Sequence, residues 1–100
     1  MAKPTWSYFV EFSDGNRKTI AKSTREYDVA WLAKGISADG TERVWMGFAR
    51  THDIAAKAIA SETAFFRNGK MYGKKYHEPG KLTHTEIIEP LKVAINQQGA

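Results

Sequence analysis

The sequence predicts one α+β domain, in which an antiparallel sheet of three to four strands packs against an alanine-rich helix and a C-terminal helix follows. Two Asp-Gly pairs, each flanked by β-branched and aromatic residues, predict two β-hairpins. Apolar residues between Thr51 and Phe66 recur at helical spacing, which predicts the alanine-rich helix. The length of 100 residues suits a single domain with a modest core over residues 1–100.

The first hairpin is predicted to turn at Asp14 and Gly15, after a strand over residues 5–12. An Asp-Gly pair suits a two-residue type I′ loop, because both central positions of that turn need positive φ angles. A two-residue loop places Glu11 opposite Lys18, where opposite charges stabilise a strand pair. The chemistry of this pair supports the predicted register.

The second hairpin is predicted to turn at Asp39 and Gly40, and the same rule places Lys34 opposite Trp45. The face that is expected to lie under the helix then carries Trp31, Ala33, Val44, Met46 and Phe48. The opposite face carries Lys34, Arg43 and Trp45 together. A helix over residues 25–36 is the alternative, since aromatic and leucine side chains also recur there near helical spacing.

The alanine-rich helix has recognisable ends. Thr51 is a suitable N-cap, and the negative charge of Asp53 suits the positive end of the helix. Asn68 and Gly69 form a plausible C-terminal stop.

The rest of the chain is predicted to hold a basic loop and a second helix. Glycines and a proline predict a loop over residues 70–81. The C-terminal helix is predicted to begin at Thr83 or Thr85 and to contain Pro90, which would remove one backbone hydrogen bond. Residues 96–100 are expected to form a frayed tail.

Composition favours a binding protein of the cytoplasm. The net charge of +4 and the pI near 9.4 favour polyanionic partners, nucleic acid first. The chain has no cysteine, which excludes disulfides and thiolate metal sites and fits a reducing compartment. No apolar run approaches the ~20 residues that a membrane span needs, and no signal peptide is visible.

Enzyme motifs are not found in the sequence. His52, His77 and His84 show no metal-ligand spacing, and neither a nucleophile elbow nor a phosphate-binding glycine loop is present. The sequence therefore predicts a protein without catalytic residues, bound metal or cofactor.

The predicted exposed face suggests a site for duplex nucleic acid. Lys34 and Arg43 can bind phosphates, arginine can also contact guanine edges, and Trp45 offers a flat apolar surface. The predicted basic loop adds Lys70, Lys74, Lys75, Tyr76 and Lys81. The alternative is that Trp45 packs under the first hairpin or the C-terminal helix, as large aromatic side chains often do.

The stretch from Trp31 to Ala58 resembles the Apetala-two DNA-binding domain of plant transcription factors and mobile-element proteins. The matching residues are Trp31, Ala33, Arg43, Val44, Trp45, Met46, Gly47, Thr51, Ala55, Ala56 and Ala58. The resemblance implies a three-stranded sheet backed by one helix, with DNA contacts from Arg43 and Trp45. The chain departs from the family pattern at Gly35, where an apolar strand residue is expected.

Two alternatives to this reading remain open. The strand-glycine-threonine-helix order is also similar to the C-terminal half of double-stranded-RNA-binding domains, although Asp53 stands where a cation is expected there, which favours DNA. A different class is a small inhibitor or adaptor of the phage or mobile-element type that binds a host protein. Trp, Tyr and Arg side chains serve as anchors in such interfaces too.

Overall fold

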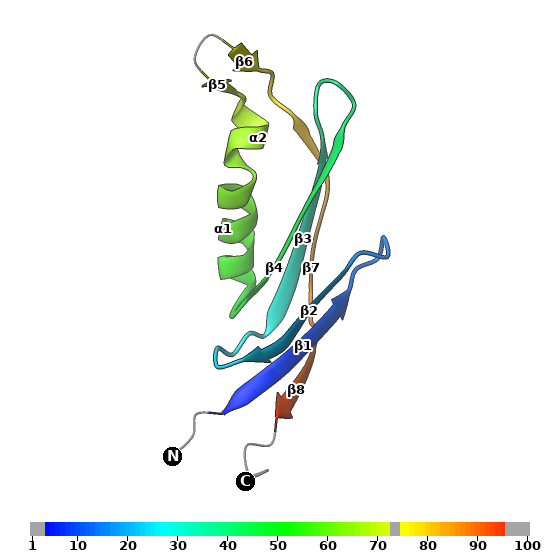
Figure 1. The fold of residues 1–100 in the computed structure, drawn as a ribbon, viewed down its shortest axis with the longest axis vertical. Helices are drawn as coiled ribbons and strands as arrows, with labels where there is room; N and C mark the ends of the chain where they lie inside the picture. Colours follow the sequence, from blue (N-terminus) through cyan, green and yellow to red (C-terminus); the bar gives the residue numbers. More distant parts are fainter. Residues whose placement is uncertain (1–3, 73–74, 96–100) are drawn as a thin grey trace.

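The structure is a computed structural model that describes residues 4–72 and 75–95. It has the predicted α+β class, with two three-stranded antiparallel sheets, a helix followed by a shorter one, and a small hairpin (Figure 1). In chain order the elements are β1 (Thr5–Glu11), β2 (Arg17–Ser23), β3 (Val29–Ile36), β4 (Glu42–Ala49), α1 (His52–Glu62), α2 (Ala64–Asn68), β5 (Lys70–Tyr72), β6 (Lys75–His77), β7 (Lys81–Ile88) and β8 (Leu91–Ile95).

The layers are arranged around the sheet with strand order β4-β3-β7, which we call the central sheet. Helix α1 covers one face of the central sheet, and the sheet with strand order β2-β1-β8, which we call the terminal sheet, crosses the other face (Figure 1). The chain leaves the terminal sheet between β2 and β3 and returns to it from the central sheet between β7 and β8. The first and last strands of the chain therefore pair with each other.

Both Asp-Gly hairpins close with three-residue loops, not with the predicted two-residue loops. In the first hairpin, the backbone N–H of Phe12 donates to the carbonyl of Asn16 at 2.8 Å, so residues 13–15 form the loop. Gly15 is the third loop residue with a φ of 91°, and Gly40 has the equivalent place and a φ of 87°. A type I turn followed by a left-handed glycine produces this loop, and it shifts the strand register by one residue.

The shift corrects the predicted pairing in the first hairpin. Glu11 lies opposite Arg17 instead of Lys18, and the two side chains form an ion pair at 2.9 Å. The cross-strand charge pairing is thus kept with a different cation. Lys18 instead lies opposite Val10, whose side chain is buried.

The same shift has a larger effect in the second hairpin. Lys34 lies opposite Val44, and Trp45 lies opposite Ala33. Because opposed residues share a face, Trp45 lies on the side of the sheet that packs against α1, together with Trp31. The prediction that Trp45 shares a face with Lys34 is therefore wrong. The helical alternative for residues 25–36 is also wrong, because residues 29–36 form β3.

The core has two parts because the central sheet is covered on both sides. Under α1 lies a cluster made of Trp31, Ala33, Ala49, Ala55 and Ile59. Between the two sheets lies a second cluster made of Val10, Phe12, Ala30 and Leu32. The small alanines on both α1 and the strands let the helix approach the sheet closely. The predicted burial of Trp31 under this helix is confirmed.

The helix begins where the sequence predicts. Thr51 is the N-cap, and its hydroxyl accepts a hydrogen bond from the N–H of Ile54 at 3.1 Å. The helix is interrupted at the buried Thr63, whose hydroxyl donates to the carbonyl of Ile59 at 2.7 Å and accepts from Arg67 Nε at 3.0 Å. A separate short helix, α2, then continues to Asn68.

The predicted C-terminal helix is wrong, because this segment forms β7 and β8. Isoleucines and a valine in the segment suit strands, and Pro90 stands between the two strands, where no ladder hydrogen bond is needed from it. The predicted loop over residues 70–81 contains the hairpin β5–β6. The predicted frayed tail, residues 96–100, lies outside the described residues.

Phe66 joins α2 to the central sheet through contacts with two glycines. Its ring lies so close to Gly35 and Gly80 that a Cβ at either position would overlap it, and its carbonyl accepts a hydrogen bond from the N–H of Gly80 at 2.7 Å. The ring also makes an edge contact with Trp45, with ring centroids 5.0 Å apart. Gly35, which departs from the Apetala-two pattern, therefore makes room for an aromatic side chain from another element.

We expect Gly35→Ala to destabilise the protein by about 1–3 kcal/mol, the usual cost of overpacking a filled core. The new Cβ would lie 2.5 Å from the ring of Phe66 and 2.9 Å from the backbone carbonyl of Lys81, and the backbone has little freedom to move away. Urea unfolding measures the loss. Adding Phe66→Leu should recover part of it if the ring is the obstacle, and an unchanged free energy of unfolding in Gly35→Ala would contradict this packing.

Candidate nucleic-acid interface

The strongest concentration of positive charge lies at one end of the molecule. Residues 70–81 contain four of the fifteen Lys and Arg residues and one of the eleven Asp and Glu residues, so three of the four net positive charges are in this segment. Its backbone forms the antiparallel hairpin β5–β6, which lies beyond α2 at the end of the molecule opposite β8 (Figure 1). The basic segment is thus a two-stranded ribbon at the end of an elongated protein.

Arg43 lies at the end of the central sheet from which this ribbon extends. Its side chain is exposed, with the guanidinium carbon 5.5 Å from the ring centroid of Trp45 and 6.0 Å from that of Phe66. Cation–π contacts of this kind hold an arginine in place while leaving its N–H groups free to bind anions. Phe66 precedes β5 by only a few residues, so Arg43 and the two rings that it contacts, Trp45 and Phe66, are neighbours of the basic ribbon.

Lys34 does not belong to this group. It lies on the other face of the central sheet, and its ammonium forms an ion pair with Asp14 at 3.1 Å. Hydrogen bonding from the backbone of Asn16, and then from Lys34, lowers the pKa of Asp14 to about 2. Lys34 therefore links the tip of the first hairpin to the central sheet, and the structure does not bring it together with Arg43 and Trp45.

The remaining predicted contact residues are described to different extents. Lys81 is exposed at the start of β7, opposite Ile36 of β3. Lys70 belongs to β5, and Lys75 and Tyr76 belong to β6. Lys74 lies outside the described residues.

A second polar contact joins the two sheets beside the ion pair of Lys34. The hydroxyl of Ser13 donates to Glu86 Oε1 at 2.6 Å, and the N–H of Ser13 donates to Glu86 Oε2 at 3.1 Å. His84 Nε2 lies 3.0 Å from Glu86 Oε1. The same carboxylate oxygen, Glu86 Oε1, therefore contacts both the serine hydroxyl and the histidine ring. The group anchors the first hairpin to β7.

This contact should make stability depend on pH in the acid range. The hydrogen bond from Ser13, followed by that from His84, lowers the pKa of Glu86 from its usual 4.5. When folding lowers the pKa of a carboxyl group, the ionised group stabilises the folded state at any pH above its pKa in the unfolded chain. This stabilisation is lost as the pH falls through the lower pKa that the group has in the folded protein.

We therefore expect Glu86→Gln to lower Tm at neutral pH, with a difference from wild type that shrinks as the pH is reduced below about 4.5. Thermal unfolding followed by circular dichroism over this pH range measures the difference. Glu89→Gln is the matched control, since Glu89 is exposed and makes no hydrogen bond within the described part of the chain. A pH-independent difference for Glu86→Gln would show that the carboxylate charge has no part in joining the sheets.

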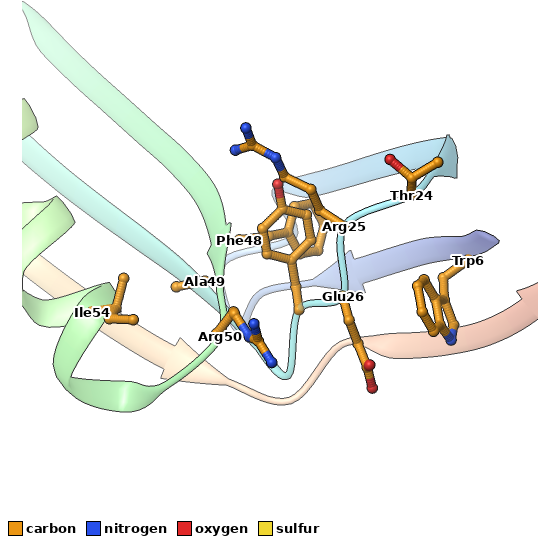
Figure 2. A pocket seen from close by; sticks show the side chains of 9 residues that line it. Trp6, Thr24, Arg25, Glu26, Phe48, Ala49, Arg50 and Ile54 are labelled. Atoms are coloured by element: carbon orange, nitrogen blue, oxygen red, sulfur yellow. The ribbon is translucent and has the colours of Figure 1, made fainter. Parts of the chain in front are cut away.

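A groove near the other end of α1 was not predicted from the sequence. It has a volume of about 570 Å³ and is lined by Trp6, Thr24, Arg25, Glu26, Tyr27, Phe48, Ala49, Arg50 and Ile54. Arg25 comes from the β2–β3 connection and Arg50 from the turn into α1 (Figure 2). Within the described residues neither arginine has an ion pair, whereas Glu26 binds Lys92. The groove is therefore both cationic and aromatic.

The β2–β3 connection that carries Arg25 is held in place by several hydrogen bonds. The hydroxyl of Tyr8 donates to the carbonyl of Arg25 at 3.0 Å and accepts from the N–H of Tyr27 at 2.8 Å. The N–H of Asp28 donates to the carbonyl of Ala49 at 3.0 Å. No local sequence motif predicts this arrangement, because the connection is bonded to two other strands, β1 through Tyr8 and β4 through Ala49.

Searches for related proteins identify no relative. No family model, no curated protein and no solved structure matches the chain. Among residues 4–72 and 75–95, no group of three or more His, Asp or Glu side chains is placed to hold a metal ion. In the same ranges no helix has the length and apolarity needed to cross a membrane.

The position of Trp45 leads to a stability prediction. Trp45 is half-buried against the α1 cluster and Phe66, so Trp45→Ala should lower the free energy of unfolding by about 2 kcal/mol, less than the ~3–5 kcal/mol expected for a large core aromatic. Trp31→Ala, at a position that is 5 % exposed, should show that larger loss. Urea unfolding compares the two variants. If Trp45→Ala has the same free energy of unfolding as the wild type, the side chain does not stabilise the fold and its role would be contact with a binding partner.

Proposed function

We propose that the protein binds duplex nucleic acid without catalysing a reaction, through the β5–β6 ribbon, Lys81 and Arg43. The observation that carries this proposal is the position of the charge: three of the four net positive charges lie in the segment that forms the ribbon and its connection to β7. Lysines on such a ribbon can neutralise phosphates, and the release of counterions favours binding. Arg43 extends the basic surface to the base of the ribbon.

The shape of the basic element favours DNA over RNA. The major groove of B-form DNA is wide enough for a two-stranded β-ribbon. The major groove of A-form RNA is deep and narrow, so a ribbon does not enter it. A ribbon with lysines therefore suits the major groove or the adjacent phosphates of duplex DNA.

The faces of the central sheet are less suitable for this role. Helix α1 covers one of them, and Val10 and Phe12 of the first hairpin pack on the other. Trp45 is engaged with Phe66, and Lys34 is neutralised by Asp14. The ribbon, in contrast, extends past the end of α2 (Figure 1).

Replacement of Lys70, Lys74, Lys75 and Lys81 by alanine should weaken binding to all DNA duplexes and flatten the dependence of log K on log salt by about one unit for each lost phosphate contact. Fluorescence anisotropy with labelled duplexes at several salt concentrations measures both effects. A matched control removes four exposed cations elsewhere: Lys22, Arg25, Arg50 and Lys57.

The control variant changes the net charge by the same amount but leaves the ribbon intact, so it should retain most of the affinity. Equal weakening in the two variants would show that only the overall charge matters. Unchanged affinity in the ribbon variant would refute the ribbon as the binding element.

The groove supports a second candidate function, a small inhibitor or adaptor that binds a host protein. Trp6, Arg25 and Arg50 are of the residue types that anchor protein interfaces. The rings of Tyr27 and Phe48 pack on each other and on Tyr8, with centroids 5.4–6.0 Å apart. Because these rings already have partners within the protein, the groove suits the stacking of a nucleic-acid base less well than it suits an acidic side chain bound by the arginines. Binding of a protein there would respond less to salt than binding of DNA.

A further inference from the structure

We propose that the groove beside the start of α1 binds an acidic peptide segment of a partner protein, in which two carboxylates bind Arg25 and Arg50 and an apolar side chain lies between them. The proposal rests on the second candidate function and names the chemistry of the partner. It does not depend on the binding of nucleic acid to the ribbon.

The two arginines are available to a ligand. Both are exposed, and within the described ranges neither side chain makes a hydrogen bond or an ion pair. Their backbones are nevertheless held, because the carbonyl of Arg25 accepts hydrogen bonds from the hydroxyls of Tyr8 and Ser23 at 3.0 and 3.2 Å, and Arg50 follows the buried Ala49. A guanidinium on a fixed backbone loses little freedom when it binds a carboxylate through its paired N–H groups.

The acidic residues of the β2–β3 connection already have a partner. Glu26 lines the groove, Asp28 follows it, and both bind the ammonium of Lys92, the second at 3.1 Å. With the two arginines this makes three cations and two carboxylates, a net charge of +1, and the arginines are the cations without an ion partner. Asp53 lies at the start of α1, where its charge offsets the positive end of the helix. The groove is therefore complementary to a negatively charged ligand.

Apolar side chains accompany the two cations. Figure 2 shows Arg25 and Arg50 at separate places along the groove, with Phe48 between them in this view. Ile54, which also lines the groove, is 49 % exposed. Alternate residues of an extended peptide project to one side. A segment with an acidic, an apolar and an acidic residue at alternate positions thus presents groups that match the groove.

The open shape of the groove favours a peptide over a small molecule. Thr24, Arg25, Arg50 and Ile54 all reach solvent, whereas a small-molecule site buries most of its ligand. An extended segment uses such a surface with one side and keeps its other side in water.

An NMR titration of the intact protein with the acetylated and amidated peptide Glu-Ser-Leu-Ser-Glu tests the proposal. Blocked termini restrict the charge to the two carboxylates. We expect chemical-shift changes at the side-chain N–H groups of Arg25 and Arg50 and at the indole of Trp6. The neutral peptide Gln-Ser-Leu-Ser-Gln should bind about tenfold more weakly, because it forms no charge-assisted hydrogen bonds.

The double variant Arg25→Gln/Arg50→Gln should weaken binding of the acidic peptide by about tenfold or more and leave the affinity for duplex DNA intact. The substitutions keep the backbone carbonyl that accepts from Tyr8, and the amide spectrum verifies the fold. The matched control, Arg43→Gln/Lys81→Gln, removes the same charge at the other end of the central sheet and should bind the peptide as the wild type does. Equal weakening by the two double variants would overturn the proposal.

A variant with stronger binding provides a test that misfolding cannot imitate. Glu26→Gln removes the carboxylate that lines the groove, so it should strengthen binding of the acidic peptide by about threefold. Unchanged or weaker binding would contradict the proposed charge complementarity.

The remaining outcomes separate this inference from the functions on which it builds. If the neutral peptide binds as tightly as the acidic one, the inference fails and the groove remains a site for protein segments. If neither peptide shifts the groove residues, the inference and the second candidate function both fail. Tighter binding of oligothymidylate or of free glutarate at the same residues would replace the peptide with a nucleic acid or a small anion.

Discussion

The fold depends on the burial of β3 from both sides. Trp31 and Ala33 contact the helix side of the central sheet, while Ala30 and Leu32 contact the terminal sheet, and all four side chains are at most 5 % exposed. A strand of this kind cannot alternate apolar and polar residues, which explains the continuous apolar run in this part of the chain. The partners of β3 are the neighbouring strand β4, the first hairpin, α1, and β7 from the last third of the sequence.

Polar contacts at the tip of the first hairpin complement this apolar packing. The Lys34–Asp14 ion pair and the Ser13–Glu86 hydrogen bonds lie side by side at the edge of the inter-sheet core. Apolar contacts specify that the sheets pack together, but they are tolerant of small rotations. Hydrogen bonds and ion pairs depend on direction, so these contacts define the angle at which the terminal sheet crosses the central sheet.

The same architecture separates the surfaces that a partner can reach. The basic ribbon lies beyond α2, the cationic groove lies beside the start of α1, and three exposed apolar side chains, Phe9, Leu91 and Val93, lie on the terminal sheet. The ribbon and the groove are both cationic, and the groove is in addition lined by aromatic side chains, Trp6, Tyr27 and Phe48. The ribbon, the element proposed to bind nucleic acid, lies at the end of the molecule opposite β8 (Figure 1).

The sequence by itself determined the features that depend on near neighbours in the chain. The α+β class, the two Asp-Gly turns and the cap at Thr51 follow from local conformational preferences and hydrogen bonds between residues a few positions apart. The concentration of lysines in residues 70–81 was visible for the same reason.

The tertiary structure alone decided the strand register of the two hairpins, the face of the sheet on which Trp45 lies, and the secondary structure of the C-terminal segment. An Asp-Gly pair fits loops of two or of three residues, and burial of Trp45 beside Phe66 is satisfied by only one of them. Residues 81–95 have a helical as well as a strand-like pattern, and pairing with β3 and β1 selects the strands. The groove and the space above Gly35 are formed by residues distant in sequence, so local preferences contain no information about them.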